Sequence, residues 1–573
     1  MATILSKAGK ALALGGAGLG TAAAYRYQNL KKEESLLPTN ELWKFSDDNL
    51  RKSNDTTNSN KKNKKQLIVV GGGVVGVTAA YKAALKGHSV VLLEPRSEPG
   101  KECSACAAGG MQRSNPVVDM STWVAVTKCI APVSRYVLGG DGGGGGRDSE
   151  PYNFFHIDWW STLTDPFFLR WVMTFTRTSF VPPPDQADKQ REMLSFTNYA
   201  IRDMVSMMND RRDPMAKKSG YNPNGSLSLS YDAADPVPVV EEKAPPTTSN
   251  SATTATIATS AAAVPNHPSG RSTYEPSKQI KGDEITQNEP SILHQKQQPT
   301  VAKFEYESSA ASSERFTEEL ADRCLRDPKL DVTFLYDTRV KAVNFHRGNS
   351  NKTKITQLRT NRGVVDVPDD AQVLVAAGSW TPHVMALMDL YAPVYPLKGY
   401  AMSISAKDVL AAKKDLRPRD LPTRIVSDKY MFTSRLGDEI RITSIGEFSG
   451  WSTSPTPKVD EEFRHEAIRQ FPQLEPFIKE AKTKCGHRPY VSDGILLLGR
   501  IHSFENLLVS CGPGSNGWKL AMGSGEIAER LVAGQTEDDI SKELGFDAHA
   551  FSPAGRVLHA PTLTRLYRAR WNV

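Results

Sequence analysis

The 573-residue chain has few cysteines and no long apolar run. Its six cysteines are too few for a disulfide scaffold of this size. No run of about 20 apolar, uncharged residues is present, which excludes a multi-span membrane protein. The formal net charge of +7 is too dilute for the clustered basic face of a nucleic-acid-binding protein. Hydrophobic residues make up only 39% of the chain, so part of its length is expected not to join a core.

Three segments are the best candidates for that part. The first 32 residues contain no acidic residue but several basic ones, which favours a mitochondrial import sequence over a secretory signal, a single membrane anchor or a disordered terminus. We therefore expect a targeting segment over 1–40, a disordered linker over 41–65, and a mitochondrial location, with association with the inner membrane as an option. Residues 233–280 lack Phe, Trp, Leu, Met and Cys, which predicts a disordered insertion at a surface hairpin.

Folded structure is expected to begin with a dinucleotide-binding unit. A β-branched run at 66–70 leads into G-x-G-x-x-G at 71–76, then a helix-like stretch, a second strand and an acid. In this pattern Gly71 permits the tight turn, Gly73 lets backbone N–H groups approach a pyrophosphate, and Gly76 allows close packing of helix and strand. Glu94 follows Gly76 by 18 residues, near the spacing of a ribose 2′-OH acceptor. The pattern indicates FAD or NAD and does not separate them.

Three further segments resemble one flavoprotein family. Residues 95–111, residues 371–380 (AQVLVAAGSW) and residues 486–518, which include GHRPYVSDG and CGPGSNGW, are similar to the flavin loop, second FAD strand and C-terminal signature of the D-amino acid oxidase superfamily. Residues 394–400 (VYPLKGY) resemble a segment of the bacterial D-amino acid dehydrogenase small subunit. The resemblance implies FAD as the cofactor and no metal. The residues it implies as FAD contacts, together with the fingerprint, are Gly71, Gly73, Val74, Val75, Gly76, Glu94, Pro95, Arg96, Ser104, Val340, Ala377, Gly378, Gly512, Gly514, Gly517 and Trp518.

The same resemblance implies an α/β architecture with two domains. One is a Rossmann-like FAD-binding domain of the glutathione-reductase-2 type, and the other is an α+β substrate-binding domain on a mixed or antiparallel sheet. The expected FAD domain comprises 66–112, 310–390 and 486–535, and the expected substrate domain comprises 113–232, 281–309 and 391–485. The tail, 536–573, is expected to be a solvated terminus, with a membrane-surface role for its arginines as the alternative.

Two side chains are candidates for the substrate site. Arg488 lies where the superfamily places an arginine that binds the substrate carboxylate, and a guanidinium matches a carboxylate in bidentate fashion. Tyr400 could line the pocket and bond the substrate. Helix-like residues 518–531 would direct their N-terminal partial charge at the flavin. Cys103 and Cys106 form a C-x-x-C that is either a redox dithiol or, more simply, a pair of small loop residues. Cys485 is the candidate for a covalent flavin link.

The resemblance implies a catalyst of FAD-dependent oxidative deamination of amino acids, D-amino acids first among them. Hydride would pass to flavin N5, giving a 2-oxo acid and ammonia, and a quinone or electron-transfer protein would accept the electrons. Two alternatives remain open. One is an amine oxidase of the sarcosine or glycine type, and the other is a non-catalytic FAD-binding assembly factor of a respiratory complex. Membrane association would run through the N-terminal segment or the basic tail.

Overall fold

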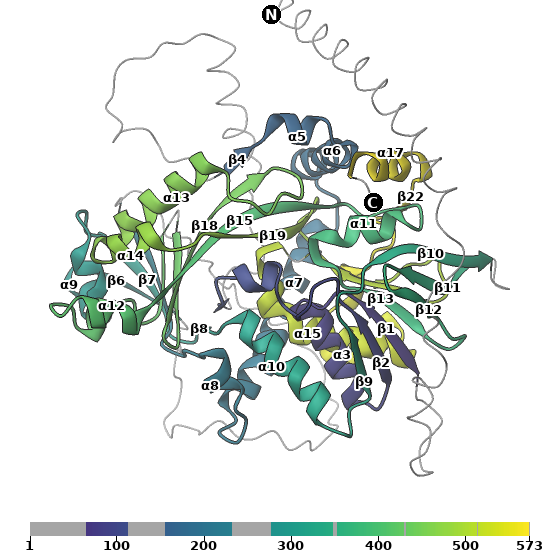
Figure 1. Ribbon diagram of the computed structural model, residues 1–573, viewed down its shortest axis with the longest axis horizontal. Coiled ribbons are helices and arrows are strands. Elements are labelled where there is room, and N and C mark those ends of the chain that lie inside the picture. Colours follow the sequence, from purple (N-terminus) through teal and green to yellow (C-terminus); the bar gives the residue numbers. More distant parts are fainter. Residues whose placement is uncertain are drawn as a thin grey trace, which may run out of the picture.

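A computed structural model of the chain describes residues 65–112, 155–231, 277–347, 352–428, 431–512 and 514–571. The predicted targeting segment, all of the predicted linker except Lys65, and residues 233–276 of the predicted insertion lie outside these ranges. Two large sheets dominate the described part (Figure 1).

The first sheet has six strands in the order β20-β21-β13-β1-β2-β9. All neighbouring pairs are parallel except β20 with β21. The inner strands are buried β-branched and leucine runs, as parallel strands covered on both faces require. The strand bounds are β1 (Gln66–Val70), β2 (Ser89–Leu93), β9 (Val332–Leu335), β13 (Gln372–Val375), β20 (Leu497–Arg500) and β21 (Leu507–Cys511).

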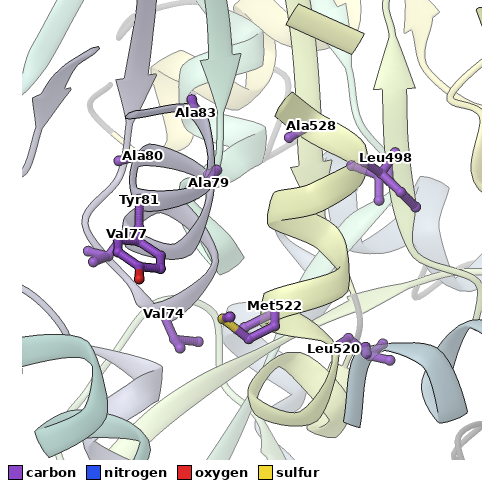
Figure 2. Packing of buried hydrophobic residues seen from close by; sticks show 14 of the residues in the cluster. Val74, Val77, Ala79, Ala80, Tyr81, Ala83, Leu498, Leu520, Met522 and Ala528 are labelled. Atoms are coloured by element: carbon purple, nitrogen blue, oxygen red, sulfur yellow. The ribbon is translucent and has the colours of Figure 1, made fainter. Parts of the chain in front are cut away.

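Helices cover one face of this sheet and a small sheet covers the other. Helices α3 (Val74–Leu85) and α15 (Gly517–Ala533) pack closely, with Val74, Val77, Leu520 and Met522 in one cluster (Figure 2). Gly525 permits this approach, because a Cβ there would lie 2.9 Å from the Thr78 carbonyl. Helix α10 (Ser313–Arg326) packs beside α3. The three-stranded sheet β10 (Val340–Arg347), β11 (Thr353–Thr360) and β12 (Gly363–Asp366) shares a second cluster with β1, β2 and β13.

The second sheet has nine strands. Eight follow the order β19-β15-β18-β17-β16-β5-β7-β6, and β4 pairs with β18. The pairing is mostly antiparallel, with two parallel pairs, β16–β5 and β18–β4. Its strands are β4 (Phe155–Ile157), β5 (Ser226–Ser230), β6 (Ser277–Lys281), β7 (Val301–Glu305), β15 (Val394–Ser405), β16 (Ile425–Ser427), β17 (Met431–Leu436), β18 (Glu439–Phe448) and β19 (Lys484–Val491).

The remaining elements are short connections and covering helices. Two-stranded pairs are formed by β3 (Gly110–Met111) with β8 (Ser309–Ala310), and by β14 (Leu390–Tyr391) with β22 (Leu558–His559). The helices are α5 (Trp159–Leu163), α6 (Pro166–Phe180), α7 (Gln186–Asn209), α8 (Met215–Ser219), α9 (Asp283–Asn288), α11 (Thr381–Ala386), α12 (Ala406–Ala412), α13 (Pro457–Gln470), α14 (Glu475–Glu480), α16 (Glu537–Leu544) and α17 (Pro561–Trp571). The 3-10 turns are η1 (Cys103–Cys106), η3 (Pro290–His294), η4 (Gly378–Trp380), η5 (Pro418–Asp420), η6 (Pro472–Leu474), η7 (Gly514–Asn516) and η8 (Ala548–Phe551).

The architecture confirms the predicted fold class, a Rossmann-like unit joined to a unit with a mixed sheet. Three segments are placed differently from the prediction. Helix α7, expected in the substrate domain, packs on α15 and α3. Strand β19, expected to open the last FAD segment, pairs with β15 of the nine-stranded sheet. Strand β6 takes up the end of the predicted disordered insertion from Ser277 onward, and it does not form a hairpin with β5, because both strands pair with β7.

The C-terminal segment is folded onto the protein, so the prediction of a solvated tail is wrong for residues 537–571. Tyr567 of α17 is completely buried, its ring stacked on that of Phe167 with centroids 3.6 Å apart. Its hydroxyl lies 2.9 Å from His383 Nδ1. Phe551 of η8 is also completely buried, against Phe196 of α7. In the described ranges no helix combines the length and apolar composition needed to cross a bilayer.

Replacing Tyr567 by Ala should therefore destabilise the protein by about 3–5 kcal/mol, because a large buried ring is removed and a cavity remains. Tyr567→Phe keeps the ring and should cost about 1–3 kcal/mol through the lost His383 contact. Denaturant unfolding of the holoprotein measures both values. Leu566→Ala, next in the chain but 44% exposed, is the control. Equal stability of the Tyr567→Ala and Leu566→Ala variants would contradict a packed tail.

Candidate functional site

A cavity of about 860 Å³ lies between the two large sheets. Its lining includes the first βα turn, the turn after β13, the loop before α15 and the facing strands of the nine-stranded sheet. Doubly wound folds bind their ligands at the carboxyl ends of the parallel strands, in the crevice where the strand order reverses. Here β1 is the branch point, with β2 on one side and β13 on the other.

Glycines of the first turn fit the backbone approach that a pyrophosphate needs. Gly71 has φ +117°, and a Cβ there would lie 2.5 Å from the Ala376 carbonyl oxygen. A Cβ at Gly76 would lie 1.9 Å from the Gly71 carbonyl oxygen. A Cβ at Gly73 meets only Ser104 Oγ, at 3.7 Å. Packing within the protein therefore explains the first two glycines, whereas Gly73 leaves room on the cavity side for a ligand.

Glu94 lies at the end of β2 on the cavity wall, where a ribose acceptor is expected. Its Oε2 accepts a hydrogen bond from Gly72 N at 2.6 Å, and its Oε1 accepts one from Arg96 N at 2.9 Å. Burial raises the pKa of the Glu94 carboxyl, and the two backbone donors oppose this. The carboxylate is thus held by the backbone in a fixed orientation toward the cavity.

Fourteen of the sixteen predicted cofactor contacts line the cavity, and two do not. Gly76 is covered by the turn itself. Arg96 contributes its backbone N–H to Glu94, while its guanidinium pairs with Glu102, which itself lines the cavity. The fourteen are Gly71, Gly73, Val74, Val75, Glu94, Pro95, Ser104, Val340, Ala377, Gly378, Gly512, Gly514, Gly517 and Trp518.

The N-terminus of α15 also opens on the cavity, as expected. The helix begins at Gly517, one residue before the predicted start, and the indole of Trp518 donates a hydrogen bond to the Gly109 carbonyl at 3.0 Å. Gly512 has φ +88°, and a Cβ there would overlap Val491 at 2.0 Å. A helix start in this position directs backbone N–H groups and partial positive charge at whatever occupies the cavity.

Arg488 lies on β19 and faces the cavity from the nine-stranded sheet. A Cβ at Gly399, on the neighbouring strand, would lie 2.8 Å from Arg488 Nε and Nη2, so the glycine leaves space for the guanidinium to lie across β15. Arg488 is half-buried, and its guanidinium makes no hydrogen bond or ion pair with any residue in the described ranges. A half-buried guanidinium that faces a cavity in this way suits a carboxylate ligand.

Tyr400, the other predicted substrate residue, does not line the cavity, and the expectation that it does is wrong. It is completely buried, its hydroxyl donates to Glu447 Oε2 at 2.6 Å, and it accepts from Thr456 N at 2.9 Å. Lys398 Nζ lies 2.8 Å from the same carboxylate. Side chains of a strand alternate between its faces, so Tyr400 points away from the face that Gly399 presents.

The raised pKa values of two described cysteines argue against a redox dithiol. Cys103 and Cys106 are free thiols on the cavity wall, and burial raises the pKa of Cys103 to about 12 and that of Cys106 to about 11. A reactive dithiol needs the opposite shift. Cys485 and His487 are outside the cavity lining, and His487 bonds the Ser452 carbonyl at 3.1 Å, as a structural histidine would. Within the described residues no cluster of His, Cys, Asp and Glu could hold a metal ion.

A polar group on the cavity wall was not predicted. Lys519 is buried on α15, and its Nζ donates to the Gln112 carbonyl at 3.3 Å. Burial lowers the pKa of Lys519 to about 8, opposed by the charge of Glu305. Glu305 in turn lies 3.0 Å from Lys303. The sequence does contain a signal for this residue, a single lysine inside the apolar run that follows Gly517. It is missed when the run is interpreted only as a helix that packs in the core.

The chain resembles known flavoproteins over most of its length. A family model described as "DAO: FAD dependent oxidoreductase" matches residues 66–531. Curated D-amino acid dehydrogenases are 30% identical in Xanthobacter autotrophicus and 31% identical in Methylobacterium radiotolerans. Each match covers 237 residues, 41% of this chain and 51% or 52% of the relative. The chain thus spans about half the length of the curated relatives it matches.

Solved structures show the same fold at low sequence identity. L-Proline dehydrogenase from P. horikoshii superposes with a TM-score of 0.52 at 14% identity, covering 89% of this chain and 98% of the other. Glycine oxidase from Geobacillus kaustophilus superposes with a TM-score of 0.51 at 16% identity, covering 85% and 98%. At these identities the likeness establishes the fold.

Two alanine substitutions separate packing from cofactor binding. Gly73→Ala should fold normally, because the protein has room for the methyl group. It should lose most of its bound FAD, because the methyl group keeps the pyrophosphate from approaching the backbone. Gly76→Ala should lose both stability and FAD, because its Cβ overlaps Gly71. The flavin-to-protein absorbance ratio and the unfolding midpoint measure the two effects. Full FAD content in folded Gly73→Ala would contradict a cofactor at this turn.

Lys519 should make stability depend on pH. Its folded pKa of about 8 lies below the value of about 10.4 for an exposed lysine, so the unfolded chain binds more protons between these pH values. Stability should therefore rise with pH in that window. Lys519→Met should stabilise the protein most at and below pH 8 and progressively less toward pH 10. Exposed Lys86→Met is the control. Urea unfolding across the range tests this, and a pH-independent difference between Lys519→Met and wild type would disprove it.

Proposed function

Because the chain belongs to the DAO family of FAD-dependent oxidoreductases, we propose that it oxidises the Cα–N bond of amino acids, with D-amino acids as the preferred class. The product imine hydrolyses to a 2-oxo acid and ammonia. The D-amino acid preference is supported by the curated relatives that are named D-amino acid dehydrogenases. FAD, when bound, supplies the two-electron acceptor for this oxidation.

The single observation that carries the proposal is the position of Arg488. Its half-buried guanidinium lies over Gly399, faces the cavity and has no carboxylate partner among the described residues. An amino acid supplies the missing anion as its α-carboxylate, held by two parallel hydrogen bonds. Two-point binding fixes the plane of the carboxylate, which restricts the direction in which the Cα–H bond points.

The other cavity residues bind the cofactor and hold its surroundings fixed. The βα turn with Gly73 and the carboxylate of Glu94 suit the pyrophosphate and ribose. The N-terminal end of α15 supplies partial positive charge from backbone N–H groups, which favours a ligand that gains negative charge on reduction. Trp518 anchors this helix end to Gly109.

Anaerobic mixing of the holoprotein with separate amino acids tests the proposal. Loss of the yellow absorbance with D-amino acids, together with 2-oxo acid formation, is the expected result. Reduction only by sarcosine or glycine would identify an amine oxidase instead, and no reduction by any amine would identify a non-catalytic FAD-binding protein. Reoxidation of the reduced protein by a quinone analogue faster than by O₂ is expected for a dehydrogenase that passes electrons to a quinone or an electron-transfer protein.

Replacing Arg488 by Met should lower kcat/KM for amino acids about tenfold to a hundredfold, because charged hydrogen bonds to the carboxylate are lost. Arg488→Lys should recover part of that loss, since it keeps the charge but not the bidentate geometry. Flavin content should stay unchanged in both variants. The matched control substrate is the amine that lacks the carboxylate, whose poor turnover should be equal in wild type and variants. Unchanged kinetics toward amino acids would remove Arg488 from the site.

A further inference from the structure

Helix α6 has two apolar faces, only one of which is buried. Phe167, Phe168 and Trp171 pack inward. On the other side Leu169, Met173 and Phe180 follow one another at intervals of four and seven residues, a spacing that places them in one stripe along the helix. Met173 is 59% exposed and Phe180 is 66% exposed. The stripe therefore faces solvent in a position where a surface helix ordinarily carries polar residues.

Segments that adjoin α6 also carry exposed apolar side chains. Val181, directly after the helix, is exposed, and Trp160 of the adjoining helix α5 is 78% exposed. Helices α5 and α17 both contact α6, and Figure 1 shows the three together at one end of the molecule. Leu566 on α17 is also exposed. We call the set Trp160, Leu169, Met173, Phe180, Val181 and Leu566 the α6 surface.

Exposed basic side chains flank the stripe on α6, and one exposed acid, Asp158, caps the neighbouring helix α5 beside Trp160. Arg170 and Arg177 flank the stripe on α6, and Arg565 lies on α17; all three are exposed. None of the three forms an ion pair with an acidic residue in the described ranges. Between residues 159 and 182 the only acidic residue is Asp165, which is completely buried and accepts a hydrogen bond from the Tyr395 hydroxyl.

The α6 surface rests on a rigid base. Trp171 donates its indole N–H to the Tyr490 carbonyl at 2.9 Å, and Phe168 packs against Tyr395 with ring centroids 5.0 Å apart. Tyr567 of α17 stacks on Phe167 from the other side. The exposed stripe is thus held in place by a buried aromatic cluster, so its exposure does not arise from a loosely attached helix.

We propose that the α6 surface docks on an anionic phospholipid bilayer, with α6 parallel to the membrane plane. Apolar side chains would enter the headgroup region while Arg170, Arg177 and Arg565 meet the lipid phosphates. A helix with an exposed apolar stripe, basic flanking residues and no acidic residue typically lies parallel to the membrane surface. A second copy of the chain fits less well, because a symmetric dimer through this surface would bring like-charged arginines together.

The test is co-sedimentation of the full-length holoprotein with vesicles of phosphatidylglycerol and phosphatidylcholine. Wild type should bind, and binding should weaken with added salt and on vesicles of phosphatidylcholine alone. The double variant Met173→Glu/Phe180→Glu should lower the partition coefficient about tenfold or more. The matched control is Leu293→Glu/Leu325→Glu, which changes two residues of 60% and 56% exposure outside the α6 surface. This control should bind like wild type.

A charge variant and two further measurements complete the test. Arg170→Gln/Arg177→Gln should weaken binding to the anionic vesicles about tenfold. Flavin content and turnover with a soluble dye should be equal in all variants, which shows that the fold and the cavity are intact. Equal vesicle binding by wild type and Met173→Glu/Phe180→Glu would overturn the proposal. Light scattering that shows a dimer dissociated by this variant, without vesicle binding, would overturn it in favour of a second copy.

Discussion

The steric contact between Gly76 and the Gly71 carbonyl is the constraint on which the rest of the structure depends. The helix α3 starts so close to the end of β1 that no side chain fits between them. This places the helix N-terminus and the turn at the same edge of the sheet as Glu94. Gly525 then lets α15 approach α3, which brings the second helix start to the same cavity. Backbone proximity, rather than a set of charged side chains, shapes the cofactor side of the site.

The opposite wall of the cavity, where we propose that the substrate binds, is built on a different principle. There a strand of the nine-stranded sheet omits a side chain at Gly399, and the guanidinium of Arg488 occupies the space. The adjacent residue, Tyr400, belongs to the opposite face and joins a buried network with Glu447 and Lys398. That network holds strands β15 and β18 together below the cavity, so it fixes the surface from which Arg488 projects. The strand pair β15–β19 thus carries the proposed carboxylate-binding residue, Arg488, on one face and the network that positions it on the other.

Local features were predictable from the sequence, and long-range ones were not. The strand–glycine–helix–strand–acid order and the helix after Gly517 depend on short-range geometry, so they were placed within one or two residues. The side of the sheet to which Tyr400 points depends on strand register, which a single sequence does not reveal. The burial of Tyr567 depends on a contact with Phe167 some 400 residues earlier in the chain. Lys519 looked like an ordinary residue of an apolar helix because its environment is supplied by Gln112 and Glu305 of other segments.

The pairing of β5 and β6 with the same central strand has a topological consequence. Ser226 and Ser277 both align with Glu305, while Ser230 and Lys281 both align with Val301, so β5 and β6 run in the same direction on either side of β7. The chain leaves this part of the sheet at one end and re-enters it at the other. A tight turn cannot connect two strands that run in the same direction, and the shortest suitable crossover has about a dozen residues. The connection from β5 to β6 therefore requires at least about a dozen residues, whatever their sequence.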